Sequence, residues 1–373
     1  MRKIILGFLK KAVFFLFVLS LSAIFVELSL RLYNPFKFRV KGGEIILPAN
    51  ERYIINNTAI DKLDKEIIHT RNSLGFRGPE PPENFDDFLS IIVVGGSSAE
   101  CSYISDTKTW PYLLGQNLQQ SCDNIWLNNA GLDGHATFGH IILLRNYLVK
   151  LRPKIILFLV GANDRAKADL SIYDKMPLAN SYNSLSDYLE KKSELVSLLS
   201  NFKRRLNAVR SGIVHEHLDL SKAESLEIPQ EKIKQEVLRH KLEYVEGYRQ
   251  RLEELISICR QNDIEPIFIT QPSLAGKAVD PVSGVNLATL KMWGNRNGEL
   301  LWSVLCLYNS TTIDVCESLG VFVIDLAAKL PKSSLYFYDR LHYTNSGCRE
   351  VAQLVYEGLK EYLDIKYPEF VRK

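Results

Sequence analysis

The sequence predicts an α/β protein: a three-layer α/β/α sandwich on a mostly parallel five-stranded sheet, preceded by one N-terminal transmembrane helix. From Leu89 onward, short apolar runs alternate with longer amphipathic segments, as strands and helices do in a parallel sheet. A chain of 373 residues with 46% apolar side chains can also form a large packed core. The segment before Leu30 stands apart, because basic residues there precede a long apolar stretch.

That stretch begins at Ala12, follows Lys10-Lys11, and continues past Glu27 to Leu30. It has about 19 residues, or roughly 28 Å as a helix, close to the hydrocarbon thickness of a bilayer. A cleaved signal peptide is the alternative, but Leu21-Ser22-Ala23 is a poor match to a cleavage site. We therefore expect an uncleaved membrane anchor over residues 1–32.

Basic residues flank the predicted anchor on both sides, so the charge bias that sets orientation is small. A short basic N-terminus normally stays in the cytoplasm. We expect a single-pass protein with a cytoplasmic N-terminus and an extracytoplasmic body. The flanking residues are Arg2, Lys3, Lys10 and Lys11 before the stretch, and Arg31, Lys37, Arg39 and Lys41 after it.

Residues 33–84 are expected to form a linker and lead-in segment, ending in Gly78-Pro79-Glu80-Pro81-Pro82. Residues 85–373 form the predicted main domain. Its five strands are predicted at Leu89 to Val94, Ile125 to Leu127, Ile155 to Val160, Ile264 to Ile269, and Val321 to Ile324. Its helices are predicted at Trp110 to Gln120, Phe138 to Leu151, about Gln230 to Arg260, Leu300 to Leu319, and about Ser346 to Leu363.

A charged segment at about residues 165–229 does not fit this alternation. It is expected to be a helical insertion, either a solvated one or a cap over a site.

The composition excludes some functions. The chain has 46 basic and 43 acidic residues, a net charge of +3, so no large field is available to hold a nucleic-acid backbone. Its six cysteines are scattered without Cys-x-x-Cys pairs or zinc-type spacing, and we expect no metal site and no cofactor.

The first candidate for chemistry is Gly95-Gly96-Ser97-Ser98, at the end of the first predicted strand. Glycines allow a sharp turn that can leave a serine hydroxyl at the carboxyl end of a strand. An ordinary strand-to-helix turn with a serine N-cap is the competing interpretation.

The second candidate is Asp339-Arg340-Leu341-His342, before the last predicted helix. A serine nucleophile needs an imidazole to take its proton and a carboxylate to hold the correct tautomer. The three-residue spacing can place Asp339 against His342 Nδ1. By itself this pairing is common enough to arise by chance.

Two further motifs follow predicted strands: Asn129-Ala130-Gly131-Leu132-Asp133-Gly134 and Gly161-Ala162-Asn163-Asp164. A glycine N–H and an asparagine amide can donate to an oxyanion. Each motif alone is equally typical of a turn.

Together, the four motifs resemble those of the SGNH hydrolases, also called the GDSL esterase/lipase family, over roughly Phe88 to Leu363. The resemblance implies a flavodoxin-like fold with Ser97, Asp339 and His342 catalytic and an oxyanion hole formed by Ser97, Gly134 and Asn163. Ser98 and Gly131 are the rivals of Ser97 and Gly134. The sequence departs from the family's Gly-Asp-Ser, which is Gly95-Gly96-Ser97 here. Asn72-Ser73-Leu74-Gly75-Phe76-Arg77-Gly78 also resembles the lead-in of anchored bacterial members, although a plain turn fits equally well.

The resemblance implies hydrolysis of carboxylic esters, with a short-chain O-acyl ester of a cell-envelope glycan or lipid as the expected substrate. Transfer of the acyl group to a sugar hydroxyl uses the same acyl-enzyme, and a non-catalytic glycan-binding protein is a third possibility. An α/β-hydrolase fits less well, because Ser97 follows the first recognisable strand instead of a later one. The expected partners are this substrate and the bilayer, with no nucleic acid.

Overall fold

The computed structural model describes residues 2–36, 40–41, 44–45, 47, 49–169, 185–210 and 217–372. The chain divides into two compact units. One consists of Met1–Ile46 with Pro177–Val214, and the other of Leu47–Met176 with His215–Lys373. The larger unit contains a five-stranded sheet and all the residues of the candidate site.

The sheet of the larger unit is fully parallel, with the order β11-β8-β7-β5-β6. Chain order therefore places the first strand between the second and the third, as in flavodoxin-like folds. The predicted α/β fold with a five-stranded parallel sheet is confirmed. The strands are β5 (Leu89–Gly95), β6 (Ile125–Asn129), β7 (Ile155–Val160), β8 (Glu265–Thr270) and β11 (Val323–Ile324).

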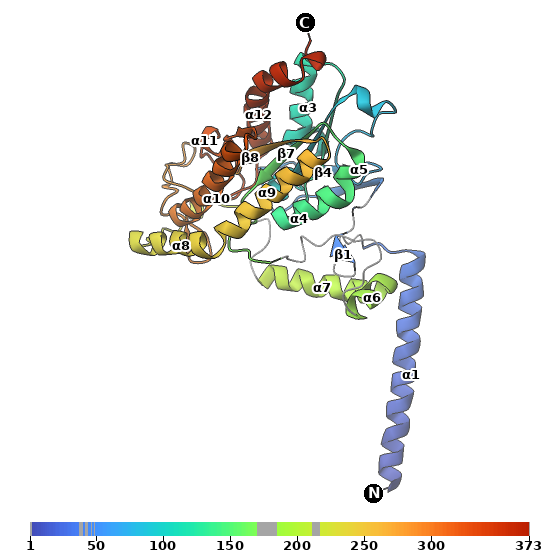
Figure 1. Cartoon of the computed structure of the whole chain (residues 1–373). Helices are drawn as coiled ribbons and strands as arrows, with labels where there is room; N and C mark the ends of the chain where they lie inside the picture. The colour runs from blue at the N-terminus through green and yellow to red at the C-terminus, as the bar shows by residue number, and fades with distance from the viewer. Residues whose placement is uncertain are drawn as a thin grey trace. The chain divides into compact units, whose positions relative to one another are not determined.

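Helices cover both faces of this sheet (Figure 1). On one face lie α3 and α12, whose apolar residues join those of the strands in one core. On the other lie α4, α9 and α10: α9 packs against both other helices, and α9 and α10 pack on β8. The helices are α2 (Ser97–Glu100), α3 (Trp110–Ser121), α4 (Thr137–Leu143), α5 (Val149–Leu151), α8 (Gln230–Glu243), α9 (Val245–Gln261), α10 (Gly298–Leu319), α11 (Leu326–Lys329) and α12 (Asn345–Lys366).

The strands and long helices have the local sequences that favour them. The central strands β5 and β7 are buried throughout, as expected for strands covered on both sides. Thr344 caps α12, because its hydroxyl accepts the Gly347 N–H at 3.0 Å. Helix α10 ends at Gly320, whose φ of 62° is accessible to glycine at little cost.

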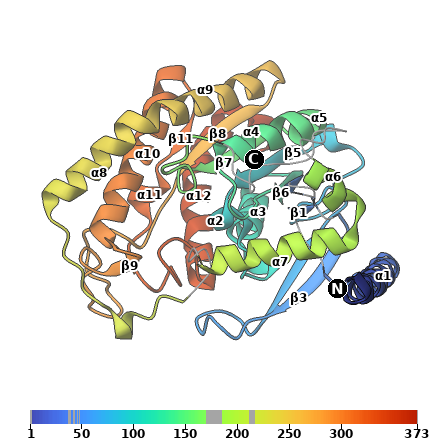
Figure 2. The ribbon, with the colours of Figure 1, turned by 90° about the horizontal axis from the view of Figure 1, so that it is seen from below.

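One segment that was predicted as a single helix forms two. The segment from Gln230 to Arg260 forms two helices, α8 and α9, interrupted at Tyr244. Figure 2 shows α8 running on into α9 in nearly the same direction. The apolar period continues through the interruption, so the sequence pattern contains no sign of it.

Residues 33–84 contain more structure than a linker. Strands β3 (Glu51–Asn56) and β4 (Glu66–Arg71) pair as an antiparallel hairpin over six residues each. Short antiparallel pairs also form between β1 (Val40–Lys41) and β2 (Glu44–Ile45), and between β9 (Lys291–Trp293) and β10 (Arg296–Asn297).

The smaller unit contains α1 (Arg2–Leu32), α6 (Leu185–Lys192) and α7 (Glu194–Arg210). Within α1, Leu9–Leu32 is long and apolar enough to cross a membrane, with a mean hydropathy of 2.4. Both α6 and α7 fall within the predicted helical insertion at about residues 165–229, while residues 170–184 and 211–216 of it lie outside the described residues.

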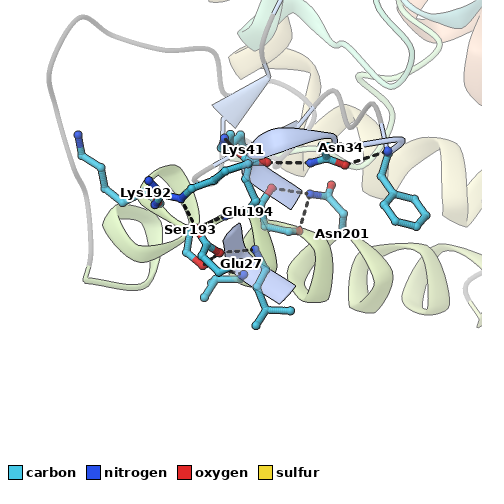
Figure 3. A network of polar contacts seen from close by, with 12 residues as sticks. Glu27, Asn34, Lys41, Lys192, Ser193, Glu194 and Asn201 are labelled. Carbon is cyan, nitrogen blue, oxygen red and sulfur yellow. Dashed lines mark hydrogen bonds and ion pairs between the residues drawn. The ribbon is translucent and has the colours of Figure 1, made fainter. Parts of the chain in front are cut away.

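The acidic residue of the apolar stretch, Glu27, is bonded to the start of α7 (Figure 3). Its carboxylate accepts the Ser193 hydroxyl at 2.7 Å and the Leu195 N–H at 2.9 Å. Arg31, one turn along α1, donates to the same carboxylate at 2.7 Å. A carboxylate at a helix N-terminus satisfies free N–H groups and interacts favourably with the helix dipole. Glu27 is therefore paired, not an isolated charge in an apolar helix.

Candidate active site

The candidate residues gather at the carboxyl edge of the parallel sheet. Ser97 follows β5, Gly134 follows β6 and Asn163 follows β7, and these three strands are neighbours. The strand order reverses between β5 and β7, which is where open α/β sheets leave a crevice for ligands. The fold thus explains how motifs that lie far apart in the sequence come together.

Ser97, His342 and Asp339 form a continuous chain of hydrogen bonds. The Ser97 Oγ lies 2.7 Å from His342 Nε2, across 245 residues of sequence. The other ring nitrogen, Nδ1, lies 2.6 Å from Asp339 Oδ2. The Tyr338 ring stacks on the imidazole with a centroid distance of 5.6 Å and an interplanar angle of 15°. An imidazole held in this way can accept a proton from the serine hydroxyl.

The second oxygen of Asp339 is held by the backbone of its own turn. Oδ1 accepts the Leu341 N–H at 2.7 Å and the His342 N–H at 2.8 Å. Burial alone would raise the pKa of this carboxyl, but the His342 imidazole and the two N–H donors outweigh burial and lower the pKa to about 2. Asp339 is therefore ionised throughout the physiological range.

Ser98, the rival nucleophile, points elsewhere. Its hydroxyl lies 3.4 Å from Gln271 Nε2 and it is buried. Its carbonyl accepts the Trp110 Nε1–H at 2.9 Å. Only Ser97 of the two contacts an imidazole, so the geometry favours Ser97.

The two candidate oxyanion glycines differ in what their N–H groups do. The Gly131 N–H donates to Asn129 Oδ1 at 2.9 Å, and a Cβ at Gly131 would collide with the Glu100 backbone. Within the described part of the chain, the Gly134 N–H makes no hydrogen bond. Gly134 has a φ of 76°, in the region that favours glycine. Gly134 is therefore the better donor for an oxyanion.

Asn163 lies directly over the glycine that precedes the serine. Its Nδ2 donates to the His135 carbonyl at 2.8 Å, which leaves the second amide hydrogen for another acceptor. A Cβ on Gly96 would overlap this Nδ2. Gly96 stands where Gly-Asp-Ser, the motif that the sequence resembles, has aspartate, and an aspartate here would require Asn163 to move.

A pocket of about 290 Å³, including its open mouth, lies at these residues. Ser97, His135, Asn163 and Leu341 line it together with Gln271. The next residue, Asp164, also lines the pocket, and its carboxylate is bonded to neighbouring side chains. Its carboxylate accepts the Thr137 hydroxyl at 2.5 Å and lies 3.5 Å from Arg251.

The lead-in segment supports α2, the short helix that begins at Ser97. The sequence did not predict this role. The Arg77 guanidinium donates to the carbonyls of Glu100, Cys101 and Ile104 at 2.6 to 2.8 Å, around the C-terminus of α2. Its Nε donates to Asp106 at 2.8 Å. The segment between β4 and the proline run is therefore part of the framework of the site.

Glu100, in α2, connects the lead-in segment with the loop that contains Gly134. Its Oε1 lies 2.5 Å from Arg71 in a fully buried ion pair, and its Oε2 accepts the Asp133 N–H at 2.5 Å. Asp133 precedes Gly134, so this one carboxylate connects the lead-in segment, α2 and the loop that contains Gly134. Pairs between residues so distant in sequence leave no local sequence signal.

No protein-family model matches the sequence, and no curated protein resembles it. Solved structures do resemble it. A G-D-S-L family lipolytic protein from Desulfitobacterium hafniense is 11% identical, with a TM-score of 0.40 over 73% of this chain and 99% of that one. A lipase/acylhydrolase from Enterococcus faecalis is 15% identical, with a TM-score of 0.40 over 74% and 97%. An acetylxylan esterase from Geobacillus stearothermophilus is 12% identical, with a TM-score of 0.41 over 72% and 93%. At these values the likeness does not by itself establish a function.

Proposed function

We propose that this protein is a serine-dependent hydrolase of carboxylic esters, with Ser97 as nucleophile, His342 as general base and Asp339 as the carboxylate that orients it. The observation that carries the proposal is the hydrogen-bond chain from Ser97 Oγ through both ring nitrogens of His342 to Asp339. This order of groups is what an activated serine nucleophile requires.

In the first step His342 Nε2 takes the Ser97 proton while Oγ attacks the ester carbonyl. The N–H groups of Ser97 and Gly134 and the amide of Asn163 stabilise the negative charge on the carbonyl oxygen. The imidazolium then gives its proton to the leaving alcohol, which leaves an acyl group on Ser97. A water molecule, activated by the same imidazole, releases the acid and restores the serine.

The substrate is expected to be a short-chain O-acyl ester of a cell-envelope glycan or lipid. The pocket beside Ser97 has about 10 Å³ of space for water-sized groups, so it offers a long acyl chain little room. The apolar α1 would keep the protein at a membrane, close to envelope substrates. We further propose that α1 is an uncleaved, single-pass anchor with its N-terminus in the cytoplasm.

Transfer of the acyl group to a sugar hydroxyl is the second candidate, because the same acyl-enzyme deacylates on either acceptor. A non-catalytic glycan-binding or assembly role is the third. It is disfavoured by the 2.7 Å contact between Ser97 and His342, which binding alone does not need.

Two serine variants test the proposal. Ser97→Ala should abolish labelling by a fluorophosphonate probe and hydrolysis of 4-nitrophenyl acetate. Ser98→Ala, at the adjacent buried serine, is the matched control and should retain both. Unchanged labelling of Ser97→Ala would refute the nucleophile assignment. Labelling of the parent without ester turnover in water, but with turnover when a glycan acceptor is added, would favour acyl transfer.

A further inference from the structure

Three arginines from separate parts of the larger unit gather beside the candidate active site. Arg165 follows β7, two residues after Asn163, and Arg340 stands between Asp339 and His342. Arg296 begins β10. All three are half-buried. Two of them are thus sequence neighbours of residues proposed to take part in catalysis.

These arginines lie within electrostatic reach of one another. The guanidinium carbons of Arg296 and Arg340 are 4.8 and 4.9 Å from the centre of the Trp293 ring. Burial, followed by the positive charges of Arg340 and Arg296, lowers the pKa of Arg165 to about 10. Burial, and to a smaller extent Arg296, also lowers the pKa of Arg340, against the opposing effect of Asp339. The cluster therefore concentrates positive charge at one place.

Among the described residues, no carboxylate forms an ion pair with any of these arginines, although Asp339 acts electrostatically on Arg340 and Glu236 on Arg296. Arg340 Nε is buried and has no hydrogen-bond partner within the described part of the chain. Among the described residues, the side chains of the cluster make one hydrogen bond, from Arg165 Nε to the Ala162 carbonyl at 2.9 Å. Other buried arginines of this unit, Arg71 and Arg77, are paired with carboxylates at 2.5 and 2.7 Å.

Three carboxylates near the cluster in the described part of the chain are each paired with another group. Asp339 binds His342 at 2.6 Å. Asp164 is bonded to Thr137 and Arg251. Glu236, which lies within electrostatic range of Arg296, is paired with Arg239 at 2.8 Å. Like charges held together without a counter-ion destabilise a fold, so a ligand that supplies the missing negative charge would be bound favourably.

We propose that Arg165, Arg296 and Arg340 bind an anionic group of the substrate, a carboxylate or phosphate on the sugar that carries the acyl ester. This inference rests on the proposed ester hydrolysis and adds that the alcohol part of the ester is negatively charged. Arg165 holds the carbonyl of Ala162, which lines the Ser97 pocket, and Arg340 adjoins Leu341, which also lines it, so these two arginines stand next to residues of the proposed ester site. Guanidinium groups match carboxylate and phosphate oxygens in geometry as well as in charge.

Pairs of substrates that differ only in charge test this subsite. We would compare O-acetyl glucuronic acid with its neutral 6-methyl ester, and O-acetyl glucose 6-phosphate with O-acetyl glucose. The full-length protein should show a higher kcat/KM for the charged member of at least one pair. A preference confined to one pair identifies the anion as carboxylate or phosphate.

Replacement of one arginine should reduce this preference. In Arg296→Gln the ratio of kcat/KM within the preferred pair should fall by about tenfold, the effect of losing one charge-assisted contact. Arg296→Lys should keep part of the preference, which separates loss of charge from loss of folding. Arg260→Gln, at an exposed arginine of α9, is the matched control and should leave the ratio unchanged.

A binding measurement separates this inference from the proposed reaction. Ser97→Ala should bind O-acetyl glucuronic acid or O-acetyl glucose 6-phosphate more tightly than the matched neutral sugar in isothermal titration. Charge-selective binding without hydrolysis of any ester by the parent would overturn the proposed function but support the subsite. Hydrolysis without charge preference, together with equal affinities, would overturn the subsite alone.

Discussion

Gly96 has a physical reason to be glycine. Its missing Cβ leaves room for Asn163 Nδ2, whose other contact is the His135 carbonyl at 2.8 Å. The amide is thus held close to the residue that precedes Ser97, the proposed nucleophile. An oxyanion donor contributes most when it is positioned before the charge develops.

Asn163→Ala should therefore lower kcat for 4-nitrophenyl acetate by about 10² to 10³, because one preorganised donor is lost from the transition state. KM should change little, since the ground-state carbonyl carries less charge than the oxyanion. Steady-state kinetics of the purified variant measure both constants. A change confined to KM would exclude the oxyanion role of Asn163.

Asp339→Asn should lose activity by about 10⁴ in kcat, because the amide no longer holds the required imidazole tautomer. It also removes a pH-dependent stabilisation. The pKa of this carboxyl is lowered from 3.8 to about 2 in the fold, so its stabilisation is complete above pH 3.8 and is lost as the pH falls through about 2.

Urea unfolding at pH 5 and pH 2.5 measures that second effect. The stability difference between the parent and Asp339→Asn should shrink by about 1.5 kcal/mol at the lower pH. A difference that stays the same at both pH values would show that the contacts of Asp339 do not hold it ionised.

The sequence predicted the groups that local motifs contain and missed those that only the fold brings together. Ser97, Asp339 and His342 stand in short motifs after or before recognisable elements. The Arg71–Glu100 pair spans 29 residues, and the contact of Arg340 with Trp293 joins the Asp339–His342 motif to the β9–β10 hairpin. Partners of this kind depend on tertiary packing, which a single sequence does not encode locally.

At the scale of elements, the strands were predicted well because buried parallel strands are short apolar runs. The interruption between α8 and α9 and the β3–β4 hairpin were not predicted. The hairpin strand Glu51–Asn56 alternates only between half-buried and exposed side chains, so its apolar signal is weak. Yet this region leads into the segment that holds α2 in place.

Arg77→Met should destabilise the fold by about 3 to 5 kcal/mol, because it leaves Asp106 and three carbonyls around α2 without their buried partner. Urea unfolding at neutral pH measures the loss. Arg145→Met is the control: its pair with Glu254 is exposed, so the change should be within about 1 kcal/mol. Equal losses in the two variants would exclude the supporting role of the lead-in segment.

At the scale of the whole molecule, positive and negative charges nearly cancel, whereas exposed apolar side chains are concentrated in one helix. Large exposed side chains are concentrated in α1, where Phe14, Phe25 and Leu32 are 68%, 72% and 89% exposed. An exposed apolar helix of this length is costly in water and favourable in lipid. Glu27, near the end of the apolar stretch, is paired with Arg31 and the start of α7, which offsets the cost of its charge.

The proposed membrane orientation of α1 decides which substrates the site can reach, and C-terminal fusions of the full chain test it. If the N-terminus is cytoplasmic, a C-terminal alkaline phosphatase should be active and a C-terminal fluorescent protein that folds only in the cytoplasm should be dark. Reversal of both signals would place the site in the cytoplasm and exclude envelope glycans as its substrates. The size of the fusion protein tests cleavage in the same experiment, because an uncleaved anchor keeps an N-terminal epitope tag, whereas a signal peptide loses it. Membrane retention in high-salt buffer would then distinguish an inserted helix from electrostatic adsorption, which salt screens.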